Sequence, residues 1–188
     1  GTELEIDVRG KRRAAEVRAG VAESRERPNI LLITVDDLHW GSLGMTGNSI
    51  PGISPNVDRL ASEGLWFAQA HVTVAICHPS RNVWMTGRYP QRFGQEFNIG
   101  QAMEAHRDVG LPVEERTLAD HLKAAGYRTA LLGKWHLGSA PRFFPLRRGF
   151  DEFFGFLAGS HTYMALGAPT NRVYDGEQEA TSMTYMTD

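Results

Sequence analysis

The sequence of 188 residues contains a single cysteine, Cys77. One thiol cannot form a disulfide bond within the chain, and it cannot supply the several thiolates of a structural zinc site. Cys77 is therefore a small buried apolar side chain, a link to another molecule or a reactive group. A lone cysteine most often packs as an apolar residue, so a reactive role needs support from its neighbours.

The sequence also lacks a strong net charge and a long apolar run. Its 20 Lys and Arg residues nearly balance its 22 Asp and Glu residues, which gives a formal net charge of -2. No global basic field therefore points to nucleic acid or to an anionic membrane, although a local anionic ligand remains open. The longest strongly apolar run, residues 30–35, is far shorter than the ~20 residues that span a bilayer. We expect no membrane span, and the charged opening stretch predicts no signal peptide.

The composition changes after residue 27. Residues 1–27 are dense in charge and have few large apolar side chains, which predicts a linker or a frayed helix. From residue 28 onward, apolar runs typical of buried strands alternate with segments of helical pattern. This alternation predicts an α/β fold, with a mostly parallel sheet and helices on both of its faces. The strands are predicted at residues 29–35, 65–75 and 127–136, and the helices at residues 54–64 and 117–126.

Both predicted helices carry signals at their ends. Ser54 followed by Pro55 is typical of an N-cap and a first helical turn. Thr117 and Asp120 have the spacing of a capping box at the start of the second helix, and Gly126 is placed to end it. These local signals predict where each helix begins, but they do not predict which element the helix packs against.

Ligands of open α/β sheets collect beyond the carboxyl ends of the strands, and two aspartates follow the first predicted strand. Asp36 and Asp37 are adjacent, so their carboxylates repel each other unless a cation or backbone donors neutralise them. A metal that prefers oxygen ligands accounts for the pair. An ordinary turn, capped by one aspartate while the other is solvated, remains the alternative.

Cys77 lies where a helix is expected to begin. Pro79 suits an early helical position, and Arg81 brings a positive charge to the same end of the helix. Such an environment favours an anion or a developing oxyanion. The alternative is the buried, unreactive cysteine described above.

Lys134 and His136 lie two positions apart at the end of the third predicted strand. Alternation along a strand places both side chains on one face, where they offer a fixed charge and a titratable imidazole to one point. An exposed lysine beside an incidental histidine is the alternative for this pair alone.

Taken together, these stretches resemble the type I sulfatases, the formylglycine-dependent branch of the alkaline phosphatase superfamily. The stretch "CHPSRNVWMTGRYP" at residues 77–90 resembles their Cys-x-Pro-Ser-Arg signature with its trailing Thr-Gly-Arg, and "GYRTALLGKWHLG" at residues 126–138 resembles their second signature. The resemblance runs from residue 28 to residue 188 and covers the N-terminal portion of the catalytic domain. Four more stretches resemble the family in the same order: "NILLITVDD", "SPNVDRLASEGLWFAQAHV", "RRGFDEFFGFLAG" and the closing "YMTD".

The resemblance implies a role for Cys77. In this family a separate formylglycine-generating enzyme reads the signature and oxidises its cysteine to formylglycine, whose hydrated aldehyde is the nucleophile. One hydroxyl of the hydrate attacks sulfur and expels the alcohol, and the other collapses to the aldehyde and releases sulfate. This divides one difficult hydrolysis into two easier steps.

The resemblance also implies roles for five other residues. Asp36 and Asp37 would bind a divalent metal, Ca2+ by family habit, together with an oxygen of the converted cysteine. Arg81 would hold the hydrate, Lys134 would contact the sulfate and the nucleophile, and His136 would help to remove a proton in the release step. Metal, lysine and arginine would all stabilise charge on the sulfate oxygens.

The sequence departs from the family pattern at several points. His78 fills the variable position of the signature, and Met85 stands where leucine is frequent. Family members usually carry a later Asp-Asn metal pair, a second lysine and a histidine that protonates the leaving group, and no Asp-Asn pair follows Lys134. His161 has a context that does not match this last histidine, so a substrate contact and an ordinary loop position both remain open. We expect residues 28–188 to be incomplete as a site and inactive alone.

The expected activity is hydrolysis of a sulfuric ester of a small molecule or a saccharide. Two alternatives remain: a hydrolase of phosphonate monoesters or phosphodiesters in the same superfamily, and a non-catalytic fragment. The implied partners are the sulfate ester and the maturation enzyme, without nucleic acid. The family implies a periplasmic or secreted location.

Overall fold

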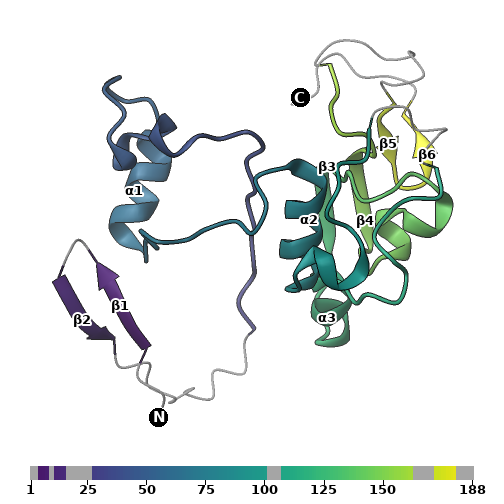
Figure 1. Ribbon diagram of the computed structural model, residues 1–188, viewed down its shortest axis with the longest axis horizontal. Helices are drawn as coiled ribbons and strands as arrows, with labels where there is room; N and C mark the ends of the chain where they lie inside the picture. The colour runs from purple at the N-terminus through teal and green to yellow at the C-terminus, as the bar shows by residue number, and fades with distance from the viewer. Residues whose placement is uncertain (1–3, 9–10, 16–26, 101–106, 163–171, 181–188) are drawn as a thin grey trace. The chain divides into compact units, whose positions relative to one another are not determined.

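The computed structural model describes residues 4–8, 11–15, 27–100, 107–162 and 172–180. The chain divides into two compact units, residues 1–71 and residues 72–188 (Figure 1). No helix in these described stretches combines the length and the apolar character that a membrane crossing requires.

The first unit opens with a β-hairpin. Strands β1 (Leu4–Val8) and β2 (Lys11–Ala15) pair antiparallel, with Leu4 opposite Ala15 and Val8 opposite Lys11. The sequence analysis predicted a linker or a frayed helix here. The difference has a local cause, because residues 4–8 alternate apolar and acidic side chains with the period of a strand.

Two apolar segments form no strand, one within the first unit and one that crosses the boundary between the units. Residues 29–35 and 65–75 have no regular secondary structure, and the side chain of Leu31 is 84% exposed. The strand predictions for these two segments are therefore wrong. A buried strand needs neighbours that pair its backbone and cover its faces, and no strand in the described part of the chain pairs with either segment.

Helix α1 (Pro55–Glu63) confirms the first helix prediction. The Ser54 side chain at its N-cap does not bond the helix backbone. Its hydroxyl instead accepts the Gly44 N–H at 2.8 Å and donates to Asp58 Oδ1 at 3.0 Å. Ser54 thereby joins α1 to the short 3-10 turn η2 (Gly44–Thr46), which follows another short turn, η1 (Trp40–Ser42).

In the described residues of the second unit, two α-helices lie beside a mixed sheet (Figure 1). The four strands described there lie in the order β3–β4–β5–β6, with β3 parallel to β4 and antiparallel pairing beyond. The α/β class is confirmed, and the one parallel pair is the part of the described sheet that follows the predicted pattern. The helices are α2 (Cys77–Thr86) and α3 (Leu118–Ala124), and the strands are β3 (Ala130–Lys134), β4 (Glu152–Phe156), β5 (Tyr174–Asp175) and β6 (Gln178–Glu179).

Helix α3 begins with the predicted capping box. The Thr117 N–H donates to Asp120 Oδ2 at 2.8 Å, and the Asp120 N–H donates to Thr117 Oγ1 at 3.0 Å. Gly126 follows the helix with a φ of 85°, a left-handed conformation that glycine adopts without steric cost. Both end signals of this helix are therefore confirmed.

One apolar cluster joins α2 to the sheet. Met85 of α2 packs with Trp135, which follows β3, and with Phe153 of β4, and all three side chains are buried. The Trp135 indole N–H donates to the Phe143 carbonyl at 2.9 Å, so its polar atom is satisfied inside the core. The remaining short turns of this unit are η3 (Pro90–Phe93), η4 (Pro141–Phe143) and η5 (Pro145–Arg147).

Candidate active site

Helix α2 begins at Cys77, as the signature predicted. The preceding residue, Ile76, is extended and has no side-chain group to cap the helix. The half-buried free thiol of Cys77 therefore lies at the positive end of the helix, where the first backbone N–H groups lack helical partners. This position favours a negatively charged atom on residue 77.

Arg81 lies one turn after Cys77 on the same helix. Four positions separate the two residues, so their side chains leave neighbouring points of one helical face. The Arg81 side chain is buried, with its guanidinium carbon 5.5 Å from the centre of the Trp84 ring. The helix start thus combines a thiol with a guanidinium that stays charged at every physiological pH.

The end of β3 differs from the predicted strand. The strand stops at Lys134, and the Trp135 and His136 N–H groups donate to the carbonyls of Phe156 and Leu157, at 2.9 and 3.2 Å. His136 has a φ of 55°, so strand alternation ends before it. Alternation therefore does not set the direction of the His136 side chain.

Two predicted site residues share an uncommon backbone conformation. Among the described residues, the non-glycine residues with positive φ are Asp37, at 54°, and His136, at 55°. Such a conformation costs roughly 1–3 kcal/mol and is concentrated at functional sites. Asp36 and Asp37 form an exposed turn in the first unit.

His136 lies beside the first turn of α2. Its ring centre is 5.9 Å from that of His78, at an interplanar angle of 60°. His136 Nε2 donates to the Ile99 carbonyl at 2.9 Å. Because a carbonyl only accepts, Nε2 carries a proton, and Nδ1 is the basic nitrogen of the neutral ring.

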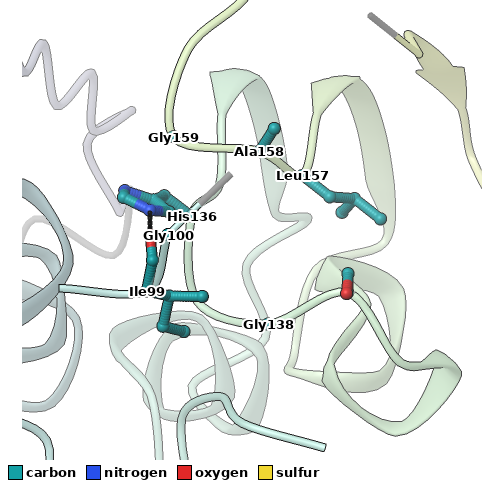
Figure 2. Close-up of a pocket in the computed structure, with 8 residues that line it drawn as sticks. Ile99, Gly100, His136, Gly138, Leu157, Ala158 and Gly159 are labelled. Atoms are coloured by element: carbon teal, nitrogen blue, oxygen red, sulfur yellow. Dashed lines mark hydrogen bonds between the residues drawn. The ribbon is translucent and has the colours of Figure 1, made fainter. Parts of the chain in front are cut away.

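A small pocket opens beside the imidazole of His136, and Figure 2 shows the hydrogen bond between this ring and Ile99. A Cβ atom on Gly159 would lie 2.8 Å from both Cε1 and Nε2 of His136. Glycine at position 159 is therefore what allows the backbone to approach the ring. The pocket is lined by Ile99, Gly100, His136, Gly138, Ser139, Leu157, Ala158 and Gly159.

His78 and His136 form a two-histidine cluster through their ring contact. The sequence analysis had noted His78 only as the variable position of the signature. Its side chain is fully buried. Its Nδ1 donates to the Phe97 carbonyl at 2.8 Å, and its Nε2 accepts from Asn82 Nδ2 at 3.1 Å. Burial lowers the pKa of His78 to about 4, the Phe97 bond opposes this shift, and the neighbouring His136 adds to it. His78 is therefore neutral at pH 7.

The structure thus groups the start of α2 with the end of β3. A helical spacing of four between His78 and Asn82 was the available signal for this buried pair, whereas their partners in residues 97–99 carried none. The ring centre of His161 lies 5.3 Å from that of Phe156. The closing "YMTD" lies outside the described residues.

Comparisons with known proteins agree with these motifs. The model of the Sulfatase family matches residues 28–184. The chain is 43% identical over 140 residues to the N-acetylgalactosamine-6-sulfatase of Sus scrofa, an alignment that covers 72% of this chain and 27% of that protein. It is 45% identical over 139 residues to arylsulfatase A of Homo sapiens, covering 73% of this chain and 26% of that protein.

A solved structure has a similar fold. The crystal structure of Ps i-CgsB in complex with k-i-k-neocarrahexaose matches with a TM-score of 0.76 and 33% identity. The match covers 86% of this chain and 39% of that one. The chain spans about a quarter of the length of the curated relatives that it matches.

Proposed function

Because the chain belongs to the sulfatase family, we propose that it supplies the nucleophile and several charged groups of an enzyme that hydrolyses organic sulfate esters. The observation that carries the proposal is the start of α2. It begins at Cys77 inside the Cys-x-Pro-Ser-Arg signature, and the ring centre of His136 lies 5.9 Å from that of His78 in the same first turn. A formylglycine at position 77 would supply a hydrated aldehyde as the nucleophile.

The surroundings of residue 77 suit an anionic nucleophile. The positive end of α2 and the buried Arg81 both stabilise negative charge on that side chain and on the sulfate. Lys134, at the end of β3, would add a third positive group that contacts the sulfate. These fixed charges need no rearrangement during the reaction, which is what makes such groups effective.

His136 has the tautomer that a base in the release step requires. Its Nε2 donates to the Ile99 carbonyl, which leaves Nδ1 as the nitrogen that accepts a proton in the neutral ring. We assign Nδ1 to the removal of the hydroxyl proton when sulfate is released. The left-handed backbone at His136 and the close approach of Gly159 hold the ring for this role.

Asp36 and Asp37 have the donor chemistry of a site for a hard cation. Calcium takes about 6 to 8 oxygen ligands, and adjacent carboxylates are typical of such sites. Asp37 also has the positive φ that concentrates at functional positions. When bound, a divalent cation, Ca2+ in our proposal, would supply positive charge that polarises the sulfate.

The substrate is proposed to be a sulfated saccharide. One similar protein is named an N-acetylgalactosamine-6-sulfatase, and one similar structure holds k-i-k-neocarrahexaose. A formylglycine-generating enzyme is the proposed maturation partner, because the signature that it reads is complete. We also propose a periplasmic or secreted location, on the basis of the same family resemblance.

The test uses the protein expressed from its whole gene together with a formylglycine-generating enzyme. We expect peptide mass and hydrazide labelling to show an aldehyde at residue 77, and aryl sulfate to be hydrolysed. The matched Cys77→Ser variant lacks the aldehyde and should lose nearly all turnover. Wild-type turnover in that variant would contradict the mechanism, and faster hydrolysis of an aryl phosphonate monoester would favour the alternative activity.

Lys134 gives a second test in the same assay. Lys134→Ala should lower kcat by about 100-fold or more, because it removes a charge that acts on the transition state. The melting temperature should hardly change, since a half-exposed lysine contributes little to folding. Lys123→Ala is the matched control, because Lys123 forms a surface ion pair with Asp151 at 2.6 Å. Equal activity of the two variants would contradict the role of Lys134.

A further inference from the structure

Residues 97–99 accept three hydrogen bonds from the two-histidine cluster. The Phe97 carbonyl accepts from His78 Nδ1 at 2.8 Å, and Asn98 Oδ1 accepts from the His78 N–H at 3.4 Å. The Ile99 carbonyl accepts from His136 Nε2 at 2.9 Å. One short segment thus holds both the residue after Cys77 and the histidine at the end of β3.

We propose that His78 is a positioning residue, which fixes the first turn of α2 against residues 97–99 and so sets residue 77 and His136 relative to each other. This inference rests on the proposed function of Cys77. His78 itself is fully buried and makes its ring contacts with protein atoms. It therefore acts through the helix start and through the shared segment.

The hydrogen bonds of the His78 ring allow a single ring orientation and a single tautomer. The Phe97 carbonyl requires a proton on Nδ1, and the Asn82 amide requires a lone pair on Nε2. The same Asn82 amide donates to the main-chain carbonyl of His78 at 3.0 Å. A flipped ring would leave at least one buried polar group without its bond, which is costly. The ring is therefore locked in both orientation and tautomer.

The two ring contacts can be separated by substitution. An asparagine amide reaches the place of the histidine Nδ1, so His78→Asn keeps a donor for Phe97 and loses the Asn82 contact. A glutamine amide reaches the place of Nε2, so His78→Gln keeps the Asn82 contact and loses the one to Phe97. His78→Leu removes both and keeps apolar volume. Of the two ring contacts, only the one to Phe97 ties His78 to residues 97–99.

We expect kcat, calculated per molecule with an aldehyde at residue 77, to stay high where the contact with Phe97 is kept and to fall where it is lost. The protein from its whole gene is matured, residue 77 aldehyde is quantified by peptide mass, and kcat and KM for aryl sulfate are measured. His78→Asn should keep kcat within about 3-fold of the wild-type value, whereas His78→Gln and His78→Leu should lose about 10- to 100-fold, because a small misplacement of reacting groups has such an effect. KM should stay within about 2-fold of the wild-type value throughout.

Stability should follow the opposite order. Glutamine and leucine fill the buried site better than asparagine, so the melting temperature of His78→Asn should be the lowest of the three. A role in packing alone would make activity follow stability. A kcat ratio of Asn to Gln variants above about three supports positioning, and a ratio below about three overturns it.

A milder pair of variants covers the case in which the buried substitutions do not fold. Asn98 and Glu96 are both exposed, so Asn98→Ala and Glu96→Ala should fold alike. Asn98→Ala removes the acceptor of the His78 N–H and should lower kcat by about 3-fold, while Glu96→Ala keeps the wild-type rate. Equal rates in the two variants overturn the proposal.

The outcomes also separate this proposal from the proposed function. A matured wild-type enzyme without turnover, or a Cys77→Ser variant as active as wild type, contradicts the function and the positioning role together. An active wild type whose His78 variants fail to show the expected order contradicts the positioning role alone.

Discussion

Residues 29–35 and strand β3 have similar sequences and different structures. Both are short apolar runs beside a charged residue, Asp36 after the first and Lys134 at the end of β3, and both were predicted to be strands. β3 pairs in parallel with β4 over five residues, whereas residues 29–35 pair with no strand in the described part of the chain and expose Leu31. An apolar pattern therefore indicates that a segment is able to form a strand, and the strand forms only where neighbouring segments pair with it.

The close pairing of β3 with β4 allows the strongest test of this comparison. A Cβ atom on Gly155 would lie 1.9 Å from the carbonyl oxygen of Gly133, the residue opposite it. Gly155→Ala should therefore separate the strands and cost about 4 kcal/mol or more of unfolding free energy, the range of severe backbone or core disruption.

Gly176→Ala is the matched control for this substitution. Gly176 has a φ of 64°, and a Cβ there would meet Leu146 at an ordinary 3.6 Å. The control therefore carries only the cost of a left-handed alanine, roughly 1–2 kcal/mol. Denaturant unfolding of both variants checks the difference, and equal losses would show that β3 and β4 are not held this closely.

A pair of leucines sharpens the comparison at the level of side chains. Leu137 is 0% exposed in the second unit and Leu31 is 84% exposed in the first. In the 188-residue chain, Leu137→Ala should cost about 2–5 kcal/mol because it leaves a cavity. Leu31→Ala should cost less than about 0.5 kcal/mol, as other exposed substitutions do. Comparable losses in thermal or denaturant unfolding would mean that residues 29–35 are buried after all.

The same contrast explains which features could be predicted from the sequence. The capping box at Thr117 and the start of α2 at Cys77 were predictable, because each depends on residues within one turn. Whether residues 29–35 form a strand depends on neighbouring strands, and no strand in the described part of the chain pairs with them. The direction of the His136 side chain depends on a positive φ that the neighbouring residues in the sequence do not predict. His78 was predictable only as a signature position, since its partner Phe97 is 19 residues away.

Two helix N-caps extend the comparison to smaller effects. The Thr117 side chain accepts the Asp120 N–H at 3.0 Å in a complete capping box, whereas the Ser54 side chain makes no bond to the backbone of its own helix. Thr117→Ala should cost about 1 kcal/mol, within the usual range for a lost cap. Ser54→Ala should leave the start of α1 intact and weaken its link to Gly44. Amide hydrogen exchange distinguishes the two, with faster exchange at the first turn of α3 in Thr117→Ala only.

The smallest expected effect is a dependence of stability on pH in the second unit. Hydrogen bonds from Lys123 and Thr129 lower the pKa of Asp151 from 3.8 to about 2. A carboxyl group with a lowered folded-state pKa stabilises the fold above its unfolded value of 3.8, and this contribution is lost as the pH falls toward about 2. Melting temperatures between pH 5 and pH 2 should therefore fall less steeply in Asp151→Asn than in the wild type. Asp175→Asn serves as the matched surface control and should keep the wild-type slope. If the two variants gave the same slope, the Lys123–Asp151 and Thr129–Asp151 contacts would not hold in solution, and the loop between α3 and β3 would be less firmly attached to β4 than the structure shows.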